Sequence, residues 1–91
     1  MLKDPMLEWT KKLLISWANI KKDRLYEFIY SLDLSNMEKR VLVLRFIPDE
    51  NEKVKTFKEI EYMYNRSHDN IMTIYTKALQ KVLDSLGPRI F

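Results

Sequence analysis

Cysteine is absent from this 91-residue chain, which also contains only one glycine and three prolines. Without cysteine the chain cannot form disulfides, use a thiolate nucleophile or hold zinc through sulfur. This composition fits a reducing, cytoplasmic location best. Glycine and proline are too scarce for the many tight turns that short strands need, and no stretch alternates apolar and polar residues. These absences predict an all-α fold.

Long apolar runs are missing as well. The longest, 13–15 and 41–44, fall far short of the roughly 20 residues that span a bilayer, and the charged N-terminus does not fit a secretory signal. The one histidine, His68, has no second histidine or cysteine nearby with which to share a metal ion. No glycine-rich phosphate loop or nucleophile–base pair is present. We therefore expect no membrane partner, no cofactor, no metal site and no enzyme activity.

Charge is distributed evenly along the chain, whose net charge is +3. Residues 1–33 contain six basic and five acidic residues, residues 34–66 contain seven and six, and residues 67–91 contain three and two. A protein that binds nucleic acid mainly through counterion release usually concentrates Lys and Arg on one face. The charge therefore permits contact with nucleic acid without requiring it.

Apolar residues make up 46% of the chain, which is enough for one compact core. Asp4 followed by Pro5 predicts a helix start, because proline is tolerated at the first helical position. This helix is expected to reach about Asn19, with an apolar stripe of Met6, Leu13, Trp17 and Ile20 and with Leu14 beside it. From Asp23 a second series, Leu25, Phe28, Ile29 and Leu32, either continues that helix or starts another. We expect residues 1–33 to form N-terminal helices that pack on the rest of the chain or dimerise.

Two capping boxes predict later helix starts. In both Ser35-Asn-Met-Glu38 and Thr56-Phe-Lys-Glu59, a hydroxyl can accept from the N–H three residues on, while the Glu bonds the cap N–H in return. They predict helices over about 36–46 and 57–64. Pro48 ends the first helix and opens a polar loop. The acidic run in this loop is interpreted as solvated, with a polymerase contact as the alternative.

Asn65 tolerates the left-handed backbone of a tight turn, and Ser67 can cap the last helix, which Gly87-Pro88 is expected to stop. The inward series of that helix is Ile71, Ile74, Tyr75, Ala78, Leu79, Val82 and Leu86. Two short capped helices joined by a brief turn form a helix-turn-helix, whose second helix reads DNA. The outward residues are then His68, Asp69, Asn70, Met72, Thr73, Thr76 and Lys77.

Three blocks resemble, in order and spacing, the C-terminal promoter-reading domain of sigma-70-type factors. They are Met37-Glu-Lys-Arg-Val-Leu-Val-Leu-Arg-Phe46, Thr56-Phe-Lys-Glu-Ile60, and Ser67 with Ile71, Ile74 and Lys77-Ala-Leu-Gln-Lys81. The likeness covers about residues 34–83, within a predicted sigma-like domain of residues 34–87. In size and layout the chain is also similar to small phage late transcription regulators. The resemblance implies binding to double-stranded DNA, with RNA polymerase and a second copy as further partners.

The resemblance also implies which residues touch DNA. Arg45, Thr56 and the start of the helix that follows it, with Lys58, match positions that touch phosphates, and the base-reading positions are matched by His68, Asp69, Asn70, Met72 and Thr73. The expected DNA contacts also include Arg66, Ser67, Thr76 and Lys77. The family usually places arginine at several base-reading positions, whereas asparagine and threonine here would suit A·T pairs. Glu61 stands where the family has a small residue, and Arg66 where it has an apolar one. An adaptor or inhibitor that binds RNA polymerase or another regulator without reading DNA is therefore the alternative.

Overall fold

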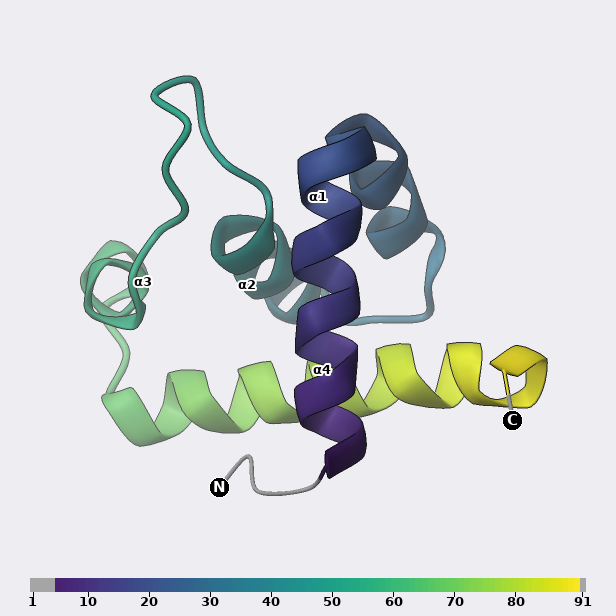
Figure 1. The fold of residues 1–91 in the computed structure, drawn as a ribbon. Helices are drawn as coiled ribbons and strands as arrows, with labels where there is room; N and C mark the ends of the chain where they lie inside the picture. The colour runs from purple at the N-terminus through teal and green to yellow at the C-terminus, as the bar shows by residue number, and fades with distance from the viewer. Residues whose placement is uncertain (1–4, 91) are drawn as a thin grey trace.

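The structure is a computed structural model that describes residues 5–90, and all its regular elements in that range are α-helices (Figure 1). The predicted all-α fold is confirmed, whereas the predicted cap at Asp4 lies outside the described residues. None of the helices in this range is both long enough and apolar enough to cross a membrane. The helices are α1 (Pro5–Ser31), α2 (Asn36–Phe46), α3 (Phe57–Tyr64) and α4 (His68–Ile90).

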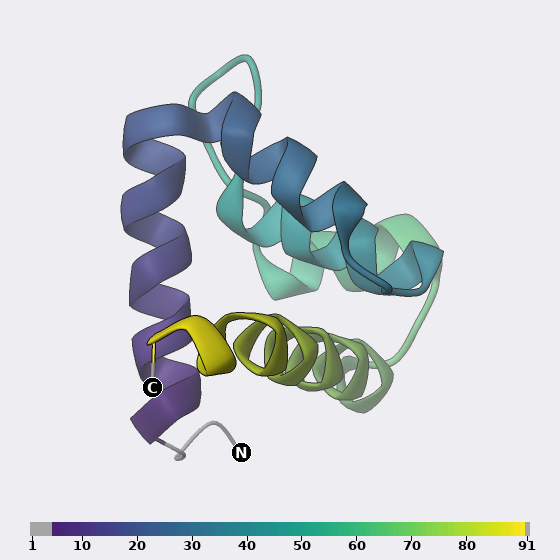
Figure 2. The ribbon, with the colours of Figure 1, turned by 90° about the vertical axis from the view of Figure 1, so that its right-hand side faces the viewer.

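A kink at Lys21, with φ −146° and ψ 72°, divides α1 into two arms. Figure 2 shows the second arm running away from the first at a steep angle. The second apolar series therefore belongs to a separate helical arm. The sequence alone allowed either one continuous helix or two. The predicted stripe of the first arm is wrong at Ile20, which is 75% exposed just before the kink. The buried positions of that arm are Leu7, Thr10, Leu14 and Ala18.

Helix α4 packs against each of the other three helices. The first arm of α1 crosses it, and the second arm of α1 lies beside α2 (Figures 1 and 2). One hydrophobic cluster joins buried side chains from all four helices. The buried residues of α4 are Ile71, Tyr75, Ala78, Leu79, Val82 and Leu83. The predicted inward face of this helix is therefore confirmed for most of its positions.

Both capping boxes are confirmed, with Ser35 and Thr56 as the cap residues of α2 and α3. The predicted stop at Gly87-Pro88 is wrong, because α4 continues to Ile90. Proline lacks an N–H and so removes one helical hydrogen bond. That loss weakens a helix locally without forcing it to end there.

Candidate nucleic-acid interface

The turn between α3 and α4 is built by short-range hydrogen bonds. Asn65 has the left-handed backbone predicted for it, with φ 51° and ψ 50°. Its neighbour Arg66 donates its backbone N–H to the Glu61 carbonyl at 3.0 Å, and the Ser67 Oγ accepts from the Asn70 N–H at 3.1 Å. These bonds satisfy backbone groups that the ends of the two helices would otherwise leave unpaired. The two helices are thereby joined by a short, hydrogen-bonded turn.

The N-terminal half of α4 has one outward face and one buried face. Ile71 and Ala78 are fully buried on the inner side. A shallow groove runs along the outer side and is lined by His68, Asp69, Met72, Thr73, Thr76 and Lys77. Six of the seven residues predicted to point outward therefore share one surface feature. The seventh, Asn70, is also exposed.

Two residues at the start of α4 are held by partners from the preceding segment. The Arg66 Nη1 donates to the Asn70 Oδ1 at 2.9 Å. The His68 Nδ1 lies 2.7 Å from the Glu61 Oε2, and the edge of its ring faces Phe57. Within the described part of the chain, the side chains of Asp69, Thr73 and Lys77 make no hydrogen bond or ion pair. In the groove, His68 therefore has a polar partner, whereas Asp69, Thr73 and Lys77 have none among the described residues.

Arg45, predicted to touch a DNA phosphate, lies in a contact inside the protein. Its Nη1 donates to the Lys55 carbonyl at 2.7 Å, and its guanidinium carbon lies 4.3 Å from the centre of the Phe57 ring. Burial raises the pKa of Tyr75 to about 12, although the nearby Arg45 charge lowers it, so the hydroxyl stays neutral. Arg45 thus joins α2 to the segment that leads into α3.

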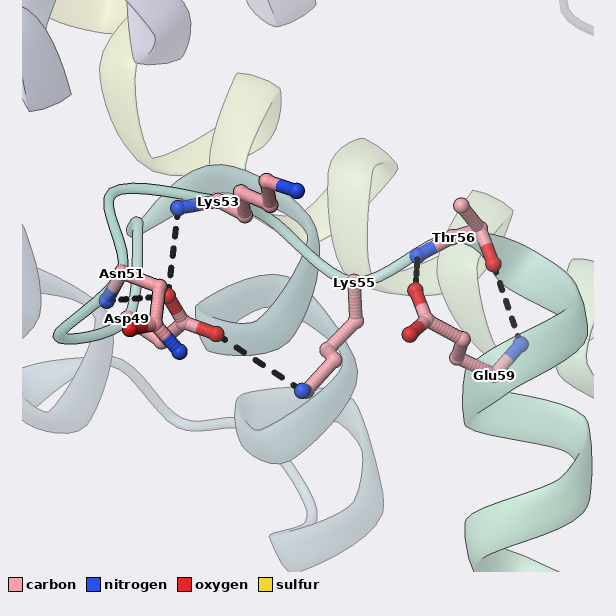
Figure 3. Close-up of polar contacts among 6 residues, drawn as sticks. All are labelled: Asp49, Asn51, Lys53, Lys55, Thr56 and Glu59. Carbon is pink, nitrogen blue, oxygen red and sulfur yellow. Dashed lines mark hydrogen bonds and ion pairs between the residues drawn. The ribbon is translucent and has the colours of Figure 1, made fainter.

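The start of α3 carries the other two predicted phosphate contacts. The Thr56 Oγ1 accepts from the Glu59 N–H at 3.1 Å, and the Glu59 Oε1 accepts from the Thr56 N–H at 2.8 Å (Figure 3). The Thr56 hydroxyl is therefore engaged in the cap. Lys58 is exposed and pairs with no acidic group among the described residues. A second shallow groove along α3 is lined by Lys55, Lys58, Glu59, Tyr62 and Met63.

The polar loop before α3 is organised by Asp49. Its Oδ1 accepts from the N–H groups of Asn51 at 2.8 Å and Lys53 at 3.1 Å, and its Oδ2 lies 3.7 Å from the Lys55 Nζ (Figure 3). The hydrogen bond from Lys53, followed by the one from Asn51, lowers the pKa of the carboxyl group. Glu50 and Glu52 are exposed in the same loop. One residue of the acidic run, Asp49, therefore forms a turn. The known preference of Asp for such turns could have indicated this role.

Sequence reasoning missed several contacts that shape this surface, among them Glu61 with His68 and Arg45 with Lys55. The partners stand seven and ten residues apart and come from different elements, so no helical spacing predicts them. No family model matches the chain, and no curated protein or solved structure matches it either. The function must therefore be argued from the geometry and chemistry of the surface itself.

Proposed function

We propose that this chain is a DNA-binding transcription regulator of the sigma-like kind, encoded by a phage or prophage, that places α4 in the major groove. The observation that supports this most directly is the outer face of α4. Hydroxyl, imidazole, carboxylate, thioether and ammonium groups gather in one shallow groove there. The opposite face of the same helix is buried against the other three helices, so the reading surface is firmly supported.

Phosphate contacts would come from exposed cations around this groove. Lys58 at the start of α3, Arg66 in the turn and Lys77 on α4 are all exposed. Each phosphate that such a cation neutralises releases bound counterions, which makes the affinity depend on salt. The even distribution of charge keeps this contribution modest for a single copy of the chain.

A second copy would add the missing affinity. The exposed apolar side chains of α1, including Ile15 at 50% and Ile20 at 75%, offer a surface for pairing. Two copies would place two α4 helices on half-sites about one helical turn apart. The second contact then forms at high effective concentration, and the complex is tighter than either half alone.

Fluorescence anisotropy on duplex fragments from the DNA around the chain's own coding sequence tests this proposal. Binding should weaken steeply between about 50 and 200 mM salt. Thr73→Ala and Lys77→Ala should both weaken it, whereas Lys22→Ala removes an exposed lysine of α1 and should leave it nearly unchanged. Equal effects of Lys77→Ala and Lys22→Ala would contradict α4 as the reading helix, and no duplex binding at low salt would overturn the proposal.

The second candidate function is an adaptor that binds RNA polymerase or another regulator without reading DNA. The observation that favours it is the apolar side of α3, where Tyr62 is 90% exposed and Met63 is 50% exposed. Methionine and tyrosine are enriched at the centres of protein interfaces. Capture of purified RNA polymerase, lost with Tyr62→Ala and unaccompanied by salt-sensitive DNA binding, would establish this function in place of the first.

A further inference from the structure

Asn70 is held at two points although it lies on the exposed side of α4. Its backbone N–H donates to the Ser67 Oγ at 3.1 Å, and its side-chain Oδ1 accepts from the Arg66 Nη1 at 2.9 Å. Among the described residues, the neighbouring Thr73 and Lys77 side chains have no such partners. The amide of Asn70 is therefore oriented before any ligand arrives.

The hydrogen bond from Arg66 determines which end of the amide is engaged. Because a guanidinium only donates, the atom that faces it must be the carbonyl oxygen, and the NH₂ group has no hydrogen-bond partner among the described residues. The oxygen has a second lone pair that can accept another hydrogen bond. An oriented asparagine with a free NH₂ group and a half-used oxygen has the donor and acceptor pair that matches the N7 and N6 atoms of adenine in the major groove.

Arg66 keeps donors to spare after this bond. A guanidinium has five N–H groups, and one is used on Asn70. The others can meet a phosphate oxygen, since arginine suits that geometry. The same side chain can thus bind the DNA backbone and orient the reader four residues along the chain.

We infer that Asn70 is a specificity-determining residue that reads the adenine of an A·T pair, and that Arg66 is its positioning residue. This inference rests on the proposed function and names the class of duplex that the α4 surface selects. Pre-orientation lowers the entropy that Asn70 loses on binding and so strengthens its contact. The contact discriminates between bases because a G·C pair does not present the matching donor and acceptor. Thr73 and Lys77, which lack such partners, contribute affinity more than discrimination.

A selection experiment with the full chain tests this assignment. Duplexes with a randomised central segment are enriched by binding, and the best duplex is then compared with single A·T to G·C changes by anisotropy. Wild-type protein should lose roughly 5- to 160-fold in affinity at one A·T pair, which is the range for a bidentate contact. Asn70→Ala should abolish the preference at that pair while keeping the preferences at the others.

The variants Arg66→Lys and Arg24→Ala separate positioning from charge. Arg66→Lys keeps the positive charge but loses the planar guanidinium that bonds Asn70. It should therefore reduce the preference for the A·T pair several-fold, with little change in the salt dependence of DNA binding. The double variant Arg66→Lys with Asn70→Ala should show no more loss of preference than Asn70→Ala alone. Arg24→Ala removes an exposed arginine of α1 and should leave the preference intact. Thermal unfolding of each variant should match the wild type, which separates these effects from misfolding.

The outcomes distinguish this inference from the proposed function. If the wild type binds duplexes without any sequence preference, or if Arg66→Lys and Asn70→Ala retain the preference, the inference is overturned while DNA binding stands. If no duplex is bound at low salt, both fail. If both Asn70→Ala and Arg66→Lys lose the preference at the same A·T pair, Asn70 is established as the reader and Arg66 as the residue that positions it.

Discussion

The two capping boxes of this protein have the same local design but different surroundings. In both, the Ser or Thr hydroxyl accepts at 3.1 Å and the Glu carboxylate accepts at 2.8 Å from the cap N–H. Glu38, in the first box, is buried and also accepts from the Lys81 Nζ of α4 at 2.9 Å. Glu59, in the second box, is exposed, and among the described residues its carboxylate accepts a hydrogen bond only from its own cap N–H. The same kind of four-residue signal therefore becomes a tertiary link in one place and stays local in the other.

A single cation ties each box to the body of the protein. Lys81 reaches the first box through the carboxylate of Glu38. Arg45 reaches the second through the backbone, because it bonds the Lys55 carbonyl just before the cap and lies over the Phe57 ring just after it. The box of α2 is thus linked to α4 by the ion pair of Glu38 and Lys81. The box of α3 is linked to α2 by the Arg45 guanidinium, which donates a hydrogen bond and also packs on the Phe57 ring.

The largest change is expected from Arg45→Ala, which would break the link of the second box. It removes a charge-assisted hydrogen bond, a cation–π contact and the packing of the side-chain stem, together worth about 2–3 kcal/mol of the free energy of unfolding. Urea unfolding measures this loss. Arg40→Ala on the same helix removes an exposed arginine that has no ion pair among the described residues, and it should cost little. Similar losses for both arginines would contradict the role of Arg45.

The next largest loss in the free energy of unfolding is expected from Glu38→Ala, which tests the difference between the two boxes. It removes the return hydrogen bond of the cap and leaves Lys81 without its partner, at a cost of about 2 kcal/mol, since half of the Lys81 side chain is exposed and can turn to water. Glu59→Ala removes the corresponding local bond and should destabilise the protein clearly less. If the two variants unfold at the same urea concentration, the tertiary link adds nothing.

Ser35→Ala and Thr56→Ala probe what the boxes share. Both hydroxyls make the same local bond, so each substitution should cost about 1 kcal/mol in chemical unfolding. Ser35→Gly and Thr56→Gly serve as controls and should cost less, because glycine is a tolerated cap residue. A loss several times larger at Ser35 than at Thr56 would show that the caps themselves, and not only their Glu residues, differ in tertiary importance.

The smallest effect is expected from acid, which should weaken the first box. Burial raises the pKa of Glu38, but hydrogen bonds from Lys81 and Ser35 outweigh it and hold the pKa below its ordinary value of about 4.5. Because the folded pKa is the lower one, the stabilisation is complete above pH 4.5 and disappears as the pH falls through the folded value. The unfolding temperature of Glu38→Gln should therefore fall less than that of the wild type from pH 6 to 3. Parallel curves would refute this contribution.

Much of the fold could be predicted because its signals are local. The boxes at Ser35 and Thr56, the turn at Asn65 and the apolar period of α4 all depend on residues within a few positions of one another, where backbone geometry determines the contact. The kink at Lys21 could not be predicted in this way. It depends on how the arms of α1 pack against α4 and α2, and no proline or glycine marks it.

On the candidate surface, too, the local features could be predicted and the long-range contacts could not. The outward set of α4 follows from helical periodicity, and the structure gathers most of it into one groove. The contacts of Arg45 with Lys55 and of His68 with Glu61 depend on where α2, α3 and α4 meet. Periodicity assigns a residue to a face of its helix but does not say which neighbouring element covers that face.

The sequence by itself determined where α2 and α3 begin, which side of α4 is buried and which residues lie outward at its start. Only the tertiary structure decided that Glu38 meets Lys81, 43 residues away, and that Arg45 contacts Lys55 and Phe57 of the segment around the start of α3. The physical reason is the range of the interactions. Hydrogen bonds within a helical turn are set by the backbone alone, whereas long side chains find their partners only after the helices have packed.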